Sequence, residues 1–132
     1  MFEVKILTAY PDMFPGVLEH SLLGSSLKKK IWSLEIINLH DFGIANRKNI
    51  DDIPFGGGPG MIIRPDVVEK SLLSIKNEEK LKRKLIYLTP SGKPLKQQNL
   101  SEFVKFNQLI LLCGRFEGVD QRAIEALNFC EF

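Results

Sequence analysis

Two short segments have the residue types expected around a bound ligand. Residues 87–92 (Tyr-Leu-Thr-Pro-Ser-Gly) and residues 114–118 (Gly-Arg-Phe-Glu-Gly) each come at or directly after the end of a short apolar run. In open α/β sheets, ligands bind outside the carboxyl ends of strands. Glycine lets the backbone approach a ligand closely because it has no Cβ. If the two strands are neighbours, these segments form opposite walls of one crevice. The alternative is that Gly114 and Gly118 are only turn residues.

A third segment, residues 51–61 (Asp-Asp-Ile-Pro-Phe-Gly-Gly-Gly-Pro-Gly-Met), is rich in glycine and proline. Its backbone is stiffened at Pro54 and Pro59, which suits contact between main-chain groups and a flat ligand. A flexible linker more often carries serine and charge than phenylalanine and methionine. The segment therefore favours a binding site over a linker. Asp51 and Asp52 could cap or turn the chain, or could place a carboxylate near a substrate.

Several other chemistries lack their motifs. The chain has no GxGxxG or GxxxxGK[ST] segment, so neither a dinucleotide fingerprint nor a P-loop is indicated. Cys113 and Cys130 have no CxxC spacing and no neighbouring histidine, which argues against a zinc site or a disulfide scaffold. With so few cysteines a reducing cytosol is the expected location. His20 and His40 have no evident partner in the sequence, and we expect both to be structural.

The composition indicates a folded domain. The chain has 132 residues, of which 44% are hydrophobic and 26% charged, which excludes a disordered chain. The formal net charge of +2 is too small to indicate a nucleic-acid partner. Residues 76–105 carry eight basic and three acidic side chains, which could meet phosphates or could be a solvated helix end. We find no secretion signal and no apolar run long enough to span a membrane.

The pattern of apolar residues predicts an α/β fold with a mainly parallel sheet. Strands are expected at residues 2–8, 31–39, 85–89 and 109–113; helices are expected at 12–30 with a break near Gly24, and at 65–76, 95–106 and 119–127. The apolar runs 85–89 and 109–113 are typical of buried parallel strands. Residues 40–60 show no sustained period. The apolar end of the chain suggests a fold cut before its last elements, with Phe129 and Phe132 exposed or engaged by a partner chain.

Four ordered motifs together carry a family resemblance. Residues 7–14, 51–61, 86–92 and 112–122 closely resemble the corresponding segments of the bacterial tRNA (guanine-N1)-methyltransferase family, TrmD, and the resemblance covers essentially the whole chain. It implies a SPOUT-type α/β domain whose C-terminal part forms a trefoil knot. It also implies S-adenosylmethionine as methyl donor, tRNA as partner, a homodimer with the active site at its interface, and a cytoplasmic location.

The resemblance assigns roles to particular positions. The cofactor-binding residues are Tyr87, Leu88, Thr89, Pro90, Ser91, Gly114, Arg115, Phe116, Glu117 and Gly118. Asp51 and the glycine-rich loop, in particular Gly58, Pro59 and Gly60, match the side that faces the target guanine. Glu117 matches a carboxylate near the reacting centre, and a Mg²⁺ ion beside it is left open. Thr89 stands where serine is common and Phe116 where tyrosine is common, and both keep the shape needed to contact adenosine.

The implied reaction moves a methyl group to N1 of the guanosine immediately 3′ of the anticodon. The family continues past Glu131 with a Gly-Asp-Tyr-Val-Leu-Ser-Gly-Gly segment, a linker bearing the general-base aspartate and a substrate arginine, and a helical tRNA-binding domain. We therefore expect residues 1–132 to form a single truncated catalytic domain that is inactive or nearly so by itself. The alternative is a non-catalytic remnant or an RNA-binding module that keeps the fold.

Overall fold

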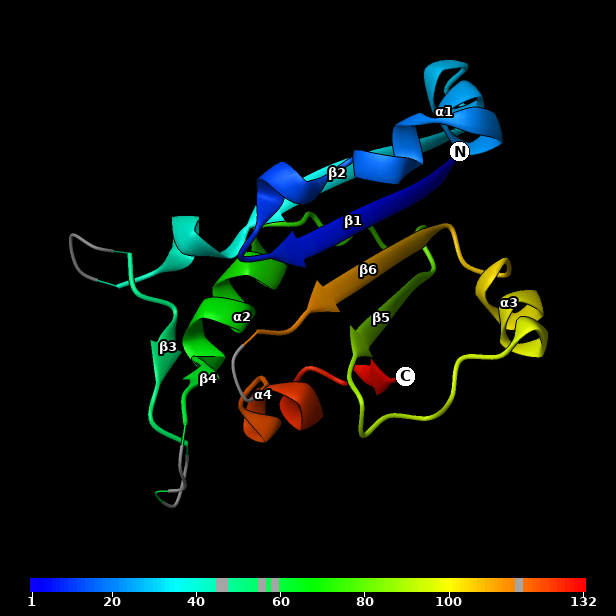
Figure 1. The fold of residues 1–132 in the computed structure, drawn as a ribbon. Helices are drawn as coiled ribbons and strands as arrows, with labels where there is room; N and C mark the ends of the chain where they lie inside the picture. Colours follow the sequence, from blue (N-terminus) through cyan, green and yellow to red (C-terminus); the bar gives the residue numbers. More distant parts are fainter. Residues whose placement is uncertain (45–47, 55–56, 58–59, 116–117) are drawn as a thin grey trace.

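Five parallel strands form the centre of the molecule in the computed structural model, which describes residues 1–44, 48–54, 57, 60–115 and 118–132. The sheet has the order β2-β1-β6-β5-β7, and every neighbouring pair in it is parallel (Figure 1). Its strands are β1 (Phe2–Thr8), β2 (Trp32–Asn38), β5 (Arg83–Leu88), β6 (Gln108–Cys113) and β7 (Cys130–Glu131). A separate antiparallel ribbon joins β3 (Asp51–Asp52) to β4 (Ile62–Ile63). The predicted α/β class with a mainly parallel sheet is confirmed.

The helices lie close to their predicted positions. They are α1 (Ser21–Lys28), α2 (Pro65–Leu73), α3 (Gln97–Phe103) and α4 (Gln121–Ala126), and three short 3-10 turns cover Pro11–Met13, Gly16–Glu19 and Leu39–Phe42. Proline at the first position of α2 costs no hydrogen bond there and supplies a helical φ. Asp120 caps α4 by accepting a hydrogen bond from the Arg122 backbone amide at 3.0 Å.

The expected break near Gly24 is wrong. The regular helix begins only after His20, and Gly24 lies inside α1. A Cβ built on Gly24 would lie 2.0 Å from the Glu19 carbonyl oxygen. The glycine is therefore needed where the Glu19 carbonyl approaches α1, and it does not end the helix.

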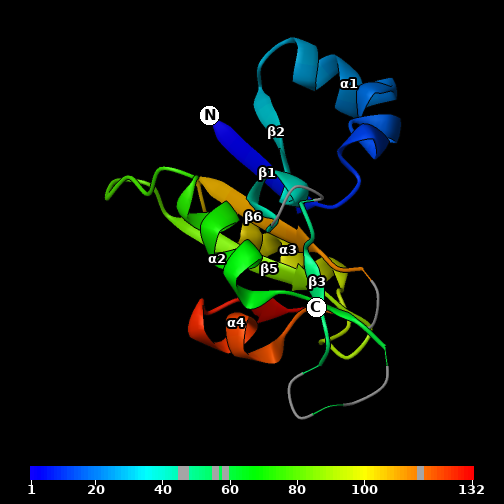
Figure 2. The same cartoon turned by 90° about the vertical axis from the view of Figure 1, so that its left-hand side faces the viewer.

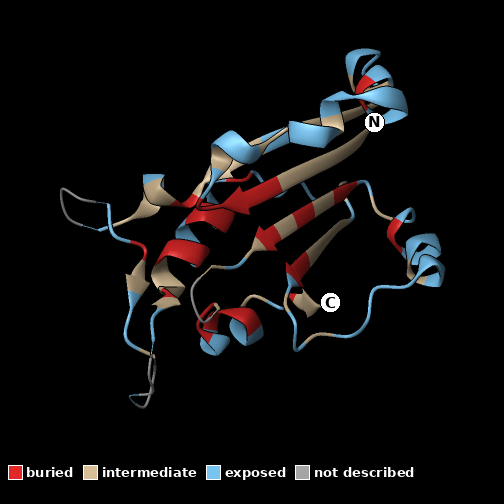
Figure 3. Cartoon of the chain, viewed as in Figure 1, coloured by how far each residue is buried: buried red, intermediate tan, exposed pale blue. Residues whose placement is uncertain are grey.

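One face of the sheet is covered and contains the main core. Leu7, Ile110 and Leu112 point to this face and are fully buried. They belong to one cluster with Val67 and Val68 of α2, and α2 and α4 lie together on this side of the sheet (Figure 2). Burial alternates along β6, so that Leu109 and Leu111 on the opposite face are only partly buried (Figure 3). The apolar runs predicted buried strands, and α2 and α4 cover these strands on one side of the sheet.

The predicted exposure of Phe129 and Phe132 is wrong. Phe129 is only 7% exposed and belongs to the core cluster. Phe132 is partly buried and makes an edge-on contact with Phe103, with ring centroids 5.3 Å apart. The cause is β7, which adds a fifth strand beside β5 and brings both aromatic rings against the domain.

The basic segment 76–105 is not a single helix end. Lys80 and Lys82 are exposed in the connector that follows α2. Lys84 lies in β5, and its ammonium is 3.4 Å from the Glu102 carboxylate. Across the described part of the chain, no helix combines the length and the apolar character needed to cross a membrane.

Candidate functional site

A cavity of about 380 Å³ opens at the carboxyl ends of β5 and β6. Its lining comes from the two segments predicted to form a crevice: Tyr87, Leu88, Thr89, Pro90, Gly114, Arg115 and Gly118. The segments meet because β5 and β6 are hydrogen-bonded neighbours, with Leu88 opposite Cys113. Loops at this edge of a parallel sheet commonly hold the ligand, and a cavity of this size lies within the usual range for a small-molecule site.

Tyr87 organises the inner wall of this cavity. Its side chain is buried, and its hydroxyl accepts a hydrogen bond from the Val119 backbone amide at 3.2 Å. A Cβ built on Gly114 or on Gly118 would lie 3.2 Å from the same hydroxyl oxygen. Gly118 also has a φ of +122°, which disfavours any side chain. The two glycines therefore allow the second segment to pack closely against Tyr87 of the first.

Arg115 brings a positive charge to the cavity. Its guanidinium lies over the Tyr10 ring, 4.8 Å from the ring centroid, in a cation–π arrangement. The Tyr10 backbone amide donates to the Thr8 hydroxyl at 3.0 Å, which holds this turn at the end of β1. Tyr10 was not among the site residues predicted from the sequence. The available signal was an aromatic residue just past the end of the first predicted strand.

The last strand holds the loop that follows β5. The Thr89 backbone amide donates to the Phe132 carbonyl oxygen at 2.7 Å, and the Phe132 amide donates to the Tyr87 carbonyl oxygen at 3.0 Å. A Cβ on Gly92 would lie 2.6 Å from the Phe132 backbone, so glycine is required for this approach. Ser91, predicted as a cofactor ligand, is exposed and lies beside the Thr89 hydroxyl at 3.1 Å, outside the cavity lining.

The glycine-rich segment is attached to the cavity through its stem. Ile63 of β4 donates its amide to the Gly118 carbonyl oxygen at 3.0 Å and accepts from the Asp120 amide at 3.2 Å. Asp51 pairs with Ile63 across the β3–β4 ribbon and is partly buried. Asp51 is therefore separated only by Ile63 from Gly118, which lines the cavity. Asp51 and Asp52 form β3, so the predicted capping or turn role is wrong.

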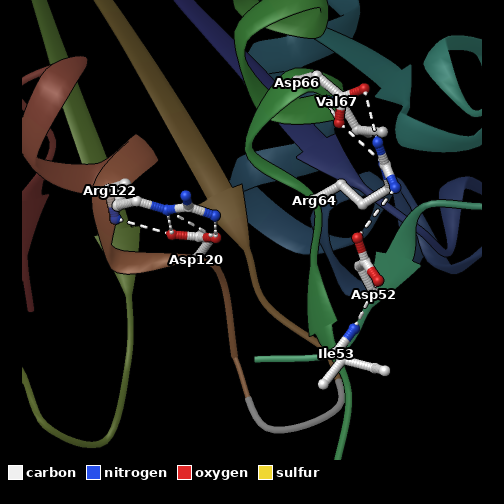
Figure 4. Close-up of polar contacts among 7 residues, drawn as sticks. All are labelled: Asp52, Ile53, Arg64, Asp66, Val67, Asp120 and Arg122. Carbon is white, nitrogen blue, oxygen red and sulfur yellow. Dashed lines mark hydrogen bonds and ion pairs between the residues drawn. The ribbon is translucent and has the colours of Figure 1, made fainter. Parts of the chain in front are cut away.

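Arg64 ties this ribbon to the start of α2 (Figure 4). Its guanidinium donates to Asp52 at 3.1 Å and to Asp66 at 3.0 Å. Burial raises the pKa of Asp66, but the hydrogen bond and charge of Arg64 outweigh it, and the pKa lies below its ordinary value. Asp52 thus serves as an ion-pair partner that anchors the stem.

A second ion pair lies on the other side of the Ile63–Val119 bridge. The Asp120 side chain is 3% exposed and accepts from the Arg122 side chain at 2.6 and 3.0 Å (Figure 4). Hydrogen bonds from Arg122 lower the pKa of Asp120. The carboxylate also caps α4, so this pair fixes the helix that follows the cavity loop.

Four predicted site residues lie outside the described residues: Gly58, Pro59, Phe116 and Glu117. The predicted carboxylate role of Glu117, and the Mg²⁺ ion left open beside it, therefore also lie outside what the structure describes. Gly60 is exposed, with a φ of +83°. Within the described ranges, no three histidine, cysteine, aspartate or glutamate side chains are grouped to hold a metal ion.

The histidines and cysteines have local surroundings. His20 immediately precedes α1, and His40 Nδ1 lies 3.3 Å from the Lys48 carbonyl oxygen. Cys113 and Cys130 are free thiols, and burial raises the pKa of Cys113.

Comparison with known proteins finds a family that matches nearly the whole chain. The family model described as "tRNA (Guanine-1)-methyltransferase TrmD" matches residues 2–131. A tRNA (guanine-N(1)-)-methyltransferase of Wolbachia sp. subsp. Brugia malayi is 50% identical over 125 residues, covering 95% of this chain and 53% of the relative. The Rickettsia rickettsii protein of the same name is 46% identical, covering 99% of this chain and 56% of its own length.

A solved structure shows the same arrangement. The crystal structure of tRNA (m1G37) methyltransferase from Aquifex aeolicus matches with a TM-score of 0.78 at 28% identity. The match covers 94% of this chain and 56% of the Aquifex chain. The chain therefore spans about half the length of the curated relatives and of the solved structure that it matches.

Proposed function

This chain belongs to the tRNA (guanine-1)-methyltransferase TrmD family, and we propose that it forms the cofactor-binding part of an enzyme that methylates N1 of a guanosine in tRNA. The cavity at the ends of β5 and β6 carries the proposal. Seven of the ten residues that match the family's cofactor-binding positions line it together. The proposed target is the guanosine immediately 3′ of the anticodon.

The cavity residues fit S-adenosylmethionine. Leu88 and Pro90 are exposed at the cavity and offer apolar surface for the adenine ring. Arg115 offers a cation that suits the carboxylate of the methionine part. Gly114 and Gly118 leave main-chain groups accessible where a Cβ would intrude on Tyr87. When bound, S-adenosylmethionine supplies an electrophilic methyl group on its sulfonium.

Guanine N1 carries a proton, so it becomes a good nucleophile only when a general base removes that proton. The reaction also needs the methyl group held in line with N1. We assign Asp51, Gly58, Pro59 and Gly60 to the guanine side and Glu117 to the reacting centre, where a Mg²⁺ ion is a further option. The attachment of the Asp51 ribbon to Gly118 supports this, because it holds the guanine side against the cavity.

The 132 residues alone should be inactive or nearly so, although they fold as one domain. The family's general base matches no position of this chain. The relatives of this chain are nearly twice as long as it is. The second candidate is a non-catalytic remnant or an RNA-binding module that keeps the fold. A tRNA substrate further suggests a cytoplasmic location, and we expect the homodimer of the family.

Cofactor binding and methylation test these proposals separately. In an NMR titration we expect S-adenosylmethionine to shift the amides of residues 87–89 and 114–118 with weak, saturable affinity. Gly118→Ala should weaken binding at least about fivefold, whereas Gly16→Ala should not, because Gly16 also has a positive φ but lies far from the cavity in sequence and has open space around it. Absence of binding even at millimolar cofactor would overturn the proposal.

Primer extension on tRNA tests the expected inactivity of this chain. Methylation at guanine N1 blocks base pairing and stops the reverse transcriptase. We expect no stop with this chain alone. A stop at the guanosine 3′ of the anticodon, at a rate comparable with a full-length relative, would contradict the expected inactivity and exclude the remnant.

A further inference from the structure

A polar hollow of about 280 Å³ lies at the end of the sheet opposite the proposed cofactor cavity. Its described lining includes Glu3 and Gln108, which stand near the start of β1 and at the start of β6, and residues that follow the end of α2. Because β1 and β6 are parallel neighbours, these starts lie together, away from the arrowheads in Figure 1. We call this surface the amino-end hollow. It shares no described lining residue with the cavity at the ends of β5 and β6.

Gln108 supplies the main observation. Its side chain is 2% exposed, and its Nε2 donates to the Glu3 carboxylate at 2.9 Å. Its Oε1 is buried and has no hydrogen-bond partner among the residues that the structure describes. The amide cannot be turned around to relieve this, because its oxygen would then face the carboxylate. Since a buried acceptor without a partner is unfavourable, Gln108 is suited to accept from a donor that enters the hollow.

The charges of the lining favour a donor that is a cation. Three carboxylates and two ammonium groups surround the hollow. Lys5 is ion-paired with Glu35, and Lys76 is 86% exposed, so solvent screens its charge. Over the described part of the chain, Glu3 receives the Gln108 hydrogen bond and forms no ion pair. The carboxylate beside the unpartnered oxygen is therefore free to pair with a ligand.

The end of α2 adds to this preference. The helix ends at Leu73, and Ser74 and Ile75 directly after it line the hollow. The C-terminus of a helix carries a partial negative charge, which stabilises a nearby cation. Ile75 and Leu81 also give the hollow an apolar part that suits the methylene groups of a short chain.

Arg83 offers another way to satisfy Gln108. It stands opposite Gln108 in the pairing of β5 with β6, and its Nη1 is also buried without a partner in the described ranges. The structure shows no hydrogen bond between these two groups, and Arg83 is not part of the described lining of the hollow. The oxygen of Gln108 is therefore left for a donor that comes from the hollow.

We propose that the amino-end hollow binds a small organic cation whose primary ammonium group donates to Gln108 Oε1 and pairs with the Glu3 carboxylate. The volume of about 280 Å³ suits a free amine with a short carbon chain. The site is separate from the cavity assigned to S-adenosylmethionine, and the proposal does not depend on methyl transfer.

The diamine putrescine is the probe, added to the isotopically labelled chain at constant ionic strength. We expect saturable NMR shifts of the Gln108 side-chain amide and of the Ser74 and Ile75 backbone amides, with the signals of residues 87–89 unchanged. Butanediol has the same carbon chain without the charge, and succinate has the opposite charge; neither should give saturable shifts. Putrescine should also raise the midpoint of thermal unfolding, because it binds the folded state.

Matched variants locate the contact. Glu3→Gln keeps an acceptor for Gln108 but removes the charge, and it should weaken putrescine binding at least about tenfold. Glu69→Gln removes the same charge from an exposed position of α2 outside the described lining, and should change binding less than about twofold. Gln108→Met keeps the side-chain length without the acceptor and should weaken binding at least about fivefold. If that buried variant does not fold, Glu3→Gln and its control still decide, because Glu3 is only partly buried.

Three results would overturn the proposal. The first is the absence of saturable shifts even at high millimolar putrescine, which would leave the Gln108 oxygen to Arg83 or to an ordered water. The second is equal weakening by Glu3→Gln and Glu69→Gln, which would reduce the effect to net charge. The third is much tighter binding of Nα-acetyl-lysine methylamide than of putrescine, which would assign the hollow to a lysine side chain of another protein. Cofactor binding without putrescine binding would count only against this inference, and the reverse only against the proposed function.

Discussion

The two faces of the sheet are built from the same strands but differ in what covers them. On one face, Ile110 and Leu112 are fully buried beneath α2 and α4. On the other, Leu109 and Leu111 alternate with them along β6 and lie at the floor of an open hollow of about 710 Å³, which we call the sheet trough and which Leu23 of α1 also lines. Along β6, therefore, both faces are apolar, and only the side chains on the covered face gain the full free energy of burial. The comparison shows that apolar strands predict where covering elements are needed, without saying which segment provides them.

Truncating neighbouring residues of β6 should give the largest difference between the faces. Ile110→Ala removes a fully buried side chain and should lower the free energy of unfolding by about 3 to 4 kcal/mol. Leu111→Ala should cost about 1 to 2 kcal/mol, because this side chain already borders solvent. Urea denaturation followed by circular dichroism measures both. Equal losses would mean that the trough is already covered in solution.

The covered face also holds an ion pair whose contribution should depend on pH. Asn can still cap α4, so Asp120→Asn removes mainly the charge and should cost about 1 kcal/mol at pH 7. Because Arg122 lowers the pKa of Asp120 below its ordinary value of 3.8, the wild-type carboxylate stabilises the fold above that pH. This contribution should disappear as the pH falls further and the folded protein takes up the proton.

Thermal unfolding between pH 3 and 7 checks the expected pH dependence. The curves of the wild type and Asp120→Asn should lie apart at neutral pH and converge at the acid end. A constant difference down to the lowest pH would show that the charge of Asp120 contributes nothing.

Changes at the side of the trough should have the smallest effect. Leu23 is 51% exposed, so Leu23→Ser should change the free energy of unfolding of the isolated chain by less than about 0.5 kcal/mol. Binding of a hydrophobic dye such as anilinonaphthalene sulfonate should fall, because the variant reduces the open apolar surface. A large loss of stability would indicate that α1 packs more tightly over the sheet than the structure shows.

The site was predictable to the extent that it depends on neighbouring strands. The segments 87–92 and 114–118 were expected to face each other if their strands were adjacent, and the pairing of β5 with β6 brings them together. Tyr10 was missed because it is distant in sequence and reaches Arg115 only through the pairing of β1 with β6. The Arg64 bridge was missed for a related reason, since Asp52 and Arg64 meet only when the β3–β4 ribbon closes.

Errors in the predicted fold came from judging residues by local preference. Gly24 was expected to break a helix, but the close approach of the Glu19 carbonyl requires glycine inside one. Phe129 and Phe132 were expected to be exposed or engaged by a partner chain because they lie at the end of the chain, yet β7 binds beside β5 and buries Phe129. In both cases a contact with another segment outweighed the local rule.

The sequence by itself determined the α/β class, the approximate positions of the helices and strands, and the family resemblance, because periodicity and short motifs are local properties of the chain. Only the tertiary structure decided the strand order, the attachment of the Asp51 ribbon to Gly118, and which face of the sheet is covered. These depend on pairing between residues far apart along the chain, whose free energy is gained only when the whole sheet assembles.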